Sequence, residues 1–315
     1  MALLLCGISS LLTPVALRAE EVRVTQSHMG MAVTLRIDID DAADRPAAQQ
    51  AAKAAFVRVG ELNAILSDWE PDSELNRLCR RAGEGPVQIS DELHTVLKAA
   101  KRLAKQSDGL LDPTAAPVIR LWREARRGGK LPDPTALAEA RACVGFNKLR
   151  LTPGHAELLR PRMQLDLGSI AKGYVGDEAI RVLKIHGFSR AIFEAGGDVV
   201  AGDAPAGEEG WLVEPDGFKP LRVANEAVAI SGDSVQFTII DGRRYGHVID
   251  PRTGEPTQSR RVCLVRAPCG IVADPLATLG TIMPWNDFKE LVNAEHPDVV
   301  IDGAEPAKSA TLPAR

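Results

Sequence analysis

The chain has 315 residues, of which 45% are apolar and 25% are charged, and its formal net charge is −4. These values are ordinary for a globular protein built as one large domain or as two closely joined ones. The acidic balance and the lack of a long basic run argue against non-specific nucleic-acid binding. We therefore expect no nucleic acid among its partners.

The N-terminus carries an apolar stretch over residues 3–17, interrupted by Pro14. It is shorter than the about 20 residues that span a membrane. Because the stretch ends at Ala19 and acidic residues follow, we predict a signal peptide over 1–19 and export of the mature chain to the periplasm, although the usual basic start is missing. A lipid anchor on Cys6 is less expected, since no small residue precedes that cysteine.

Strand and helix patterns are mixed in the first half of the chain. Alternation of apolar residues predicts a strand hairpin over 22–39. An alanine-rich helix with an apolar stripe follows over 47–66. Ser90 is expected to begin a second long helix, and shorter helices are predicted over 114–125 and from Asp133 to about 144. The basic residues 126–130 are predicted to form a solvated loop.

The second half is richer in strands. Apolar and polar residues alternate over 163–167, and a helix is predicted from there to Gly187. Later strands are expected over 191–193, 199–200, 211–213, 227–230, 237–240, 245–249 and 262–265, with a helix ending at Ile282 or Met283 and another over 287–294. Helices and strands mix without regular βαβ alternation, which favours an α+β fold.

The passage from the strand at 163–167 into the following helix is the most informative stretch of the chain. An abrupt turn through Gly168 and Ser169 would leave backbone N–H groups and the positive end of the helix dipole pointing outward. That geometry suits a phosphate or another anion. The alternative is an ordinary capped helix start, with Asp166 or Ser169 as the cap.

Five cysteines occur, at positions 6, 79, 143, 263 and 269. None forms a C-x-x-C pair, so we expect no zinc site. Cys6 would leave with the signal peptide. The other four either include a disulfide, as an exported protein allows, or remain buried free thiols.

Asp274 and Thr278 are four residues apart, so they share a face if the segment is helical. A carboxylate and a hydroxyl are hard oxygen ligands that suit Mg²⁺, especially where substrate phosphates complete the site. The alternative is that Asp274 is a helix N-cap with Pro275 as the first helical residue.

His247 and Trp69 are the two remaining candidates for a functional role. Histidine titrates near neutrality and is a common general base, but a lone histidine on the strand predicted here can equally be structural. Trp69 lies in a polar loop, where an indole can stack on an aromatic ligand. The alternative for Trp69 is an ordinary packed side chain.

Several motifs occur together in a fixed order. In this order and spacing the set resembles the ApbE family of FAD:protein FMN transferases, from about Val22 to about Val300. The resemblance implies two α+β subdomains with the flavin site between them, over residues 22–300, and a polar tail over 301–315. The segments that carry it are Ser67–Asn76, Leu111–Thr114, Asp166–Asp177, Gly196–Asp198, Ser231–Asp233, His247–Pro251 and Ala273–Thr278.

The resemblance also assigns roles to residues. It implies that Asp274 and Thr278 bind Mg²⁺, helped by backbone oxygens near Ala277 and near Ser169 or Ala171. It makes His247 the base that activates the acceptor hydroxyl. Family members usually lack a proline where Pro275 stands. The flavin-contacting positions it implies are Met29, Trp69, Leu111, Asp112, Asp166, Lys172 and Val248, and Lys172 can alternatively be a solvated helix lysine.

The implied activity is Mg²⁺-dependent transfer of FMN from FAD to a serine or threonine hydroxyl of an acceptor redox protein, with release of AMP. The acceptor would account for any association with the inner membrane. Two alternatives remain open: an FAD pyrophosphatase that gives FMN and AMP, and a non-catalytic flavin carrier or assembly factor for a redox complex. Product analysis separates the three.

Overall fold

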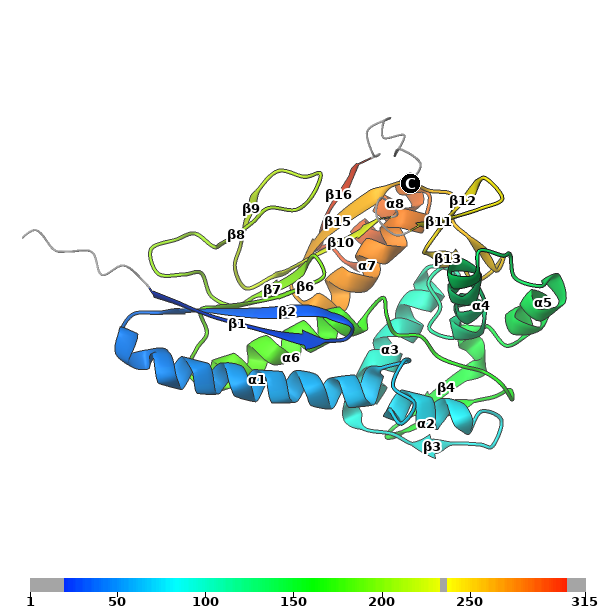
Figure 1. Ribbon diagram of the computed structural model, residues 1–315, viewed down its shortest axis with the longest axis horizontal. Coiled ribbons are helices and arrows are strands. Elements are labelled where there is room, and N and C mark those ends of the chain that lie inside the picture. The colour runs from blue at the N-terminus through cyan, green and yellow to red at the C-terminus, as the bar shows by residue number, and fades with distance from the viewer. Residues whose placement is uncertain (1–19, 233–236, 305–315) are drawn as a thin grey trace, which may run out of the picture.

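A computed structural model describes residues 20–232 and 237–304 (Figure 1). The predicted signal peptide at 1–19 and Asp233 of the Ser231–Asp233 motif lie outside the described residues. So does most of the predicted tail, at 305–315. No helix in the described part of the chain is long and apolar enough to cross a bilayer.

A seven-stranded sheet is the largest element of the fold. Every neighbouring pair of strands in it is antiparallel. Separate groups of helices beside an antiparallel sheet define the α+β class, and the predicted class is confirmed. The strands, in their order across the sheet, are β1 (Glu20–His28), β2 (Met31–Ile39), β6 (Ala191–Ala195), β7 (Asp198–Ala201), β10 (Ala227–Gly232), β15 (Val262–Ala267) and β16 (Val300–Ala304).

Both faces of this sheet are covered. Helices pack on one face, where Val33, Leu35 and Ile37 of β2 are fully buried. A hairpin of β8 (Trp211–Val213) and β9 (Leu221–Val223) covers part of the other, and buries Trp211. Five of the helices that share the main core with the sheet are α1 (Arg45–Leu66), α3 (Asp91–Gln106), α6 (Ala171–Ile185), α7 (Gly270–Ile282) and α8 (Trp285–Glu295).

Most of the remaining elements form a second group, on the right-hand side of Figure 1, toward which α1 runs. Leu75, Leu78 and Leu149 of this group belong to the same core as the sheet, so the two groups share one interior. The group contains α2 (Glu74–Arg80), α4 (Ala116–Gly128), α5 (Pro134–Ala142), the sheet β3 (Val87–Gln88), β5 (His155–Leu158) and β4 (Leu149–Thr152), the short helix η2 (Phe146–Lys148), and the hairpins β11 (Phe237–Ile240) with β12 (Arg243–Gly246) and β13 (Ile249–Asp250) with β14 (Glu255–Pro256). The short helix η1 (Ala42–Asp44) does not belong to it, since it directly precedes α1.

Local helix signals agree with the observed helix starts. The side chains of Ser73, Ser90 and Asp133 each accept a hydrogen bond from a backbone N–H in the first turn of α2, α3 and α5. This is the N-cap geometry, which such residues favour because it satisfies N–H groups that the helix leaves free. At the other end of α6, Gly187 adopts a φ of +88° just after the helix, as predicted for a C-terminal stop.

Several predicted elements differ from the structure. Residues 163–167 form no strand, although Met163, Leu165 and Leu167 are buried. Arg126 and Arg127 lie in the last turn of α4 rather than in a loop. Residues 300–304 form β16, paired with β15, so the domain extends beyond the predicted start of the tail at residue 301. The strand prediction at 163–167 rested on the alternation of apolar and polar residues. It was wrong because an extended segment can bury every second side chain without pairing to a neighbouring strand.

The four described cysteines are free thiols, so the disulfide alternative is wrong for them. Cys143 and Cys263 are buried. Burial raises the pKa of Cys263 to about 12 and that of Cys79 to about 11. A thiol with such a pKa stays protonated at neutral pH and is a poor nucleophile.

Helices α6 and α7 touch backbone to backbone at two glycines. A Cβ placed on Gly173 would lie 2.0 Å from the carbonyl oxygen of Gly270, and a Cβ on Gly270 would lie 2.3 Å from the carbonyl oxygen of Gly173. Real Cβ atoms do not come so close to backbone, so only glycine permits this crossing. The contact brings Lys172 and Asp274 within hydrogen-bond distance of each other.

We therefore predict that Gly173→Ala lowers the free energy of unfolding by about 3 kcal/mol or more, because the new methyl group must push the two helices apart. The matched control is Gly60→Ala in α1, where a Cβ meets nothing within 4 Å. That change should stabilise the protein by about 0.5–1 kcal/mol, since alanine favours a helix interior. Urea unfolding of both variants measures the difference, and a Gly173→Ala protein as stable as the wild type would contradict the prediction.

Candidate active site

A cavity of about 1170 Å³ lies between the two groups of elements. The sheet group contributes residues of strands β2, β6, β7, β8, β10 and β15 and of helices α6 and α7 to its wall. The second group contributes the loop after α1, helix α4 along most of its length and the segment between β12 and β13. Ten of the predicted site residues line it: Trp69, Leu111, Asp112, Asp166, Ser169, Lys172, His247, Val248, Asp274 and Thr278.

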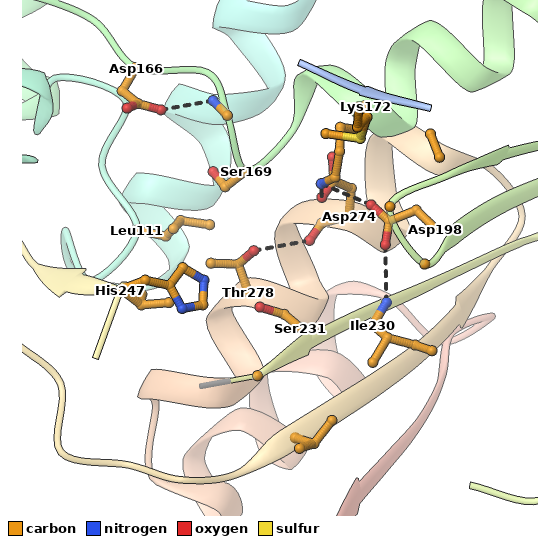
Figure 2. A pocket seen from close by; sticks show the side chains of 18 of the residues that line it. Leu111, Asp166, Ser169, Lys172, Asp198, Ile230, Ser231, His247, Asp274 and Thr278 are labelled. Carbon is orange, nitrogen blue, oxygen red and sulfur yellow. Dashed lines mark hydrogen bonds and ion pairs between the residues drawn. The ribbon is translucent and has the colours of Figure 1, made fainter. Parts of the chain in front are cut away.

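The inner wall of the cavity holds a lysine clamped by two carboxylates (Figure 2). The Nζ atom of Lys172 is 2.7 Å from Oδ1 of Asp274 and 2.8 Å from Oδ2 of Asp198. Asp274 and Asp198 are only 3% and 5% exposed. One cation and two carboxylates leave a net charge of −1 in this buried cluster when all three groups are ionised. A buried excess of negative charge is costly, so the cluster favours an added cation.

Electrostatics within this lysine–carboxylate cluster fix Lys172 in its charged form. Burial lowers the pKa of Lys172, but Asp274 and Asp198 raise it more, and the net shift is upward. Burial raises the pKa of Asp198, and Lys172 opposes that shift. Backbone donors hold the carboxylates in place: N–H of Gly173 donates to Asp274 over 3.1 Å, and N–H of Ile230 donates to Asp198 over 3.1 Å. Lys172 is therefore no solvated helix lysine.

The N-cap alternative for Asp274 is wrong. Helix α7 begins at Gly270, so Asp274 and Pro275 lie inside it. The start of the helix is satisfied instead by Asp177 of α6, whose two carboxylate oxygens accept from N–H of Gly270 over 2.6 Å and of Ile271 over 2.9 Å. Asp274 is thus free of any capping role and its carboxylate points at Lys172.

Thr278 lies one turn after Asp274 on the same face of α7, as the spacing predicts. Both residues line the cavity, and the Thr278 hydroxyl donates to the carbonyl oxygen of Asp274 over 3.4 Å. Ser169 also reaches the cavity (Figure 2). Ala171, in the first turn of α6, and Ala277, which is buried in α7, are not among the residues that line it.

Asp166 does not cap α6, and neither does Ser169, since the helix starts after Ile170 with no side-chain cap. The capped-helix alternative for this turn is therefore wrong. One oxygen of Asp166 accepts from N–H of Gly168 over 2.8 Å, and the other pairs with Arg123 over 2.7 Å. Burial and the nearby Asp68 raise the pKa of Asp166, while Arg123 lowers it.

Arg123 was not identified from the sequence, although it organises the outer wall. Its guanidinium also pairs with Asp68 over 2.5 Å and lies 4.5 Å from the ring centroid of Trp69. A planar cation over an indole is a favourable stacking arrangement. The indole is 64% exposed, so Trp69 is not an ordinary packed tryptophan. The sequence does contain one feature that points to Arg123. The spacing of Arg120, Arg123 and Arg127 places three arginines on one face of α4.

Met29 and Asp112, two further residues predicted to contact the flavin, are placed differently from the others. Met29 is not among the cavity-lining residues: it occupies the β1–β2 turn with a φ of +52°, and Met31 lines the cavity instead. Asp112 reaches the cavity wall, but its oxygens accept from N–H and Oγ1 of Thr114 and from N–H of Phe146. Asp112 therefore holds the turn before α4 in shape and has little capacity left for a ligand.

His247 lies at a bend between β12 and β13, not on a continuous strand as predicted. A bend breaks the alternation of faces, so His247 and the next residue, Val248, both line the cavity. In the view of Figure 2 the imidazole points toward Thr278 and Ser231, which line the same cavity. The site therefore combines hard oxygen groups, a half-buried lysine and an imidazole.

Comparison with known proteins agrees with this geometry. The model of the ApbE family matches residues 29–301. The chain belongs to the ApbE family. The FAD:protein FMN transferase of Treponema pallidum is 31% identical over 301 residues, which cover 87% of this chain and 82% of the relative. That of Haemophilus influenzae is 30% identical over 292 residues, covering 86% and 84%.

A solved ApbE structure shares the fold. The flavin transferase ApbE from Vibrio cholerae superposes with a TM-score of 0.78 at 25% identity, covering 90% of this chain and 93% of that one. A second structure of the Vibrio protein, in which one histidine is replaced by glycine, gives a TM-score of 0.80 at 27% identity and the same coverage. The ApbE membership and the α+β fold are thus both established for the chain.

The carboxyl of Asp177 that holds the start of α7 should make the stability of this ApbE chain depend on pH. Burial raises its pKa to about 6, against the opposing effect of its two N–H donors, whereas an unfolded aspartate has a pKa of about 3.9. The folded state therefore binds more protons between these values, and the free energy of unfolding falls as pH rises through them.

Asp177→Asn should remove this part of the pH dependence while keeping one acceptor for the α7 N–H groups. Between about pH 4 and pH 7 the wild type should lose up to about 3 kcal/mol more stability than the variant, at 1.36 kcal/mol per pKa unit. Urea unfolding at the two pH values measures this, with Asp287→Asn at an exposed position of α8 as the control. Equal pH dependence in wild type and Asp177→Asn would contradict the assignment.

Proposed function

We propose that this protein transfers FMN from FAD to a serine or threonine hydroxyl of another protein in a Mg²⁺-dependent reaction. The relatives are named FAD:protein FMN transferases. The observation that carries the proposal is the buried, net negative cluster of Lys172, Asp198 and Asp274 in one cavity with His247. Such a cavity combines a place for a cation, a positive group for phosphate and a candidate base.

The residues present fit Mg²⁺. This ion prefers hard oxygen ligands and is commonly held by one or two carboxylates together with substrate phosphates. Asp274 and Thr278 offer a carboxylate and a hydroxyl on one helix face, and Asp198 adds negative charge next to them. The described residues contain no cluster of three or more histidine, cysteine or acidic side chains that could hold a metal without such help. A Mg²⁺ ion bound there supplies charge neutralisation for the pyrophosphate of FAD.

The proposed reaction is a substitution at phosphorus, of the same kind as phosphoryl transfer. The acceptor oxygen forms a bond to the phosphorus of the FMN half, the bond from that phosphorus to the bridging oxygen breaks, and AMP leaves with the bridging oxygen. His247 takes the proton of the attacking hydroxyl. Lys172 balances the charge of the phosphate oxygens from the inner wall. In transfers of this kind, positioning and electrostatic stabilisation supply most of the rate enhancement.

Trp69 supplies an aromatic face for the ligand. Its exposed indole is held by Arg123, which is itself fixed by Asp68 and Asp166. Because the guanidinium is anchored at both ends, the indole presents a rigid surface at the cavity wall. A rigid aromatic platform stacks on a flavin or adenine ring with little loss of side-chain entropy.

The proposed activity and its two alternatives give three distinguishable outcomes. Incubation with FAD, Mg²⁺ and a candidate acceptor protein should give an acceptor heavier by the mass of FMN, together with AMP. EDTA should abolish the transfer, and added Mg²⁺ should restore it, because the oxygen ligands need the cation to bind the pyrophosphate. Mass spectrometry and in-gel flavin fluorescence measure the outcome. Free FMN with AMP would indicate a pyrophosphatase, and unchanged FAD a carrier, and either would overturn the proposal.

His247→Ala should separate proton transfer from binding. If the imidazole is the general base, the variant should fold and bind FAD with near wild-type affinity, while single-turnover transfer falls by about 10²- to 10⁴-fold. The matched control is His186→Ala, at an exposed position after α6. Melting temperature, FAD binding and transfer are measured on one preparation. A folded, FAD-binding variant with the wild-type transfer rate would rule out the role.

We also propose a periplasmic location and an acceptor that belongs to a redox system, possessing a target serine or threonine. The location is supported by the apolar stretch before Ala19 alone. A mature chain that begins near Glu20, found by mass spectrometry of the periplasmic fraction, is the observation to seek. An intact N-terminus retained in the cytosol would contradict the proposed location.

A further inference from the structure

A second cavity, of about 440 Å³, adjoins the main one and shares Trp69, Arg123 and Arg127 with it. It is formed mainly by α2, α4 and the loop between α1 and α2. Four arginines and two acidic residues line it, so its lining carries a charge of +2. These residues are Arg80, Arg120, Arg123 and Arg127 against Asp68 and Glu124.

The arginines of this arginine-lined cavity differ in how they are engaged. Arg123 is neutralised by its two carboxylates. Arg80 donates to the carbonyl oxygen of Pro71 over 2.6 Å and lies 3.9 Å from an exposed carboxylate, that of Asp72. Arg120 and Arg127 form no ion pair with a carboxylate among residues 20–232 and 237–304. They are the cations that remain available for a ligand.

The positions of these arginines follow from the helix. Arg120, Arg123 and Arg127 are spaced by three and four residues, so all three project from one face of α4. Like charges at this spacing destabilise a helix by a few tenths of a kcal/mol per pair. Packing does not require this arrangement either, because Arg127 is exposed and Arg120 half-buried. Glu124 lies on the same lining and offsets part of this repulsion, but the face keeps an excess of positive charge, which suits an anionic ligand.

We propose that the arginine-lined cavity binds an acidic segment of the acceptor protein and so guides the target hydroxyl into the main cavity. The proposal rests on the proposed function, since a transferase that modifies a protein must hold the residues that flank the modified one. Guanidinium groups bind carboxylates through paired, charge-assisted hydrogen bonds. Exposed tryptophan and arginine are also the residues most enriched in the energetic centres of protein interfaces.

The two cavities meet at Trp69, and this explains why the arginine-lined cavity suits the acceptor. Trp69 is exposed and belongs to both linings, so a chain bound along the arginines reaches the main cavity past the indole. Arg80 and Arg120 line only the smaller cavity. A change at either residue can therefore weaken acceptor binding without removing a side chain from the lining of the main cavity.

The test uses a fluorescently labelled hexaglutamate peptide as probe, without FAD or Mg²⁺, so that it does not depend on transfer activity. The peptide should bind the wild-type chain and dissociate as salt rises, because exposed charge pairs are screened. Arg120→Glu should weaken binding by at least about tenfold, since it replaces attraction by repulsion. Arg120→Lys, which keeps the charge, should retain most of the affinity, and Lys289→Glu on the exposed side of α8 should retain all of it.

FAD affinity is measured on the same variants by flavin fluorescence. Unchanged FAD binding in Arg120→Glu, with lost peptide binding, supports a separate acceptor site. No hexaglutamate binding by the wild type, or equal binding by Arg120→Glu, would overturn the proposal. So would loss of FAD binding in Arg120→Glu or displacement of the peptide by AMP or inorganic phosphate, because the cavity would then take a small anion. If the peptide binds as proposed but no acceptor is ever flavinylated, the proposed function fails and the anion-binding site remains.

Discussion

The direct backbone contact between Gly173 and Gly270 is the constraint on which the site depends. Because neither residue has a side chain, α6 and α7 approach until a carbonyl oxygen of each fills the space where the other would carry a Cβ. This proximity lets Lys172 of one helix reach Asp274 of the other, and lets N–H of Gly173 donate to the same carboxylate. Asp177 then fixes the first turn of α7 from α6, so the same pair of helices sets both the position and the register of the cluster.

The two walls of the main cavity repeat one electrostatic arrangement. On the inner wall Lys172 lies between two carboxylates, and on the outer wall Arg123 does. Each cation is fixed at both ends, because removing one partner would leave a buried charge without compensation, at a cost of several kcal/mol. Each group of three also keeps one negative charge in excess when fully ionised. The inner excess suits a divalent cation. In the outer group burial and Asp68 raise the pKa of Asp166, and Arg123 and Arg120 lower it.

Much of the fold could be predicted where the determining interactions are local. Caps such as Ser90 act within one turn of a helix, and the shared face of Asp274 and Thr278 follows from helical spacing alone. The prediction failed where a distant residue decides the outcome. Asp274 followed by Pro275 resembles a helix start, but the true start is satisfied by Asp177, 93 residues earlier in the chain. Arg123 was missed for the same reason, since its partners Asp68 and Asp166 come from two separate loops.

The candidate site residues come from two kinds of segment, the regular elements of the core and irregular segments at the surface. Lys172, Asp198 and Asp274 lie on helices and a sheet strand of the core, which suits groups that must hold phosphate and a cation at fixed distances. His247 lies at a bend between two short hairpins, and Trp69 lies in the loop between α1 and α2. Loops at a surface can bring functional groups to a partner without disturbing the core that positions the rest. The part of the cavity wall that must admit a protein, with His247 and Trp69, is therefore built from irregular segments. The arginines of α4 lie beside this part of the wall.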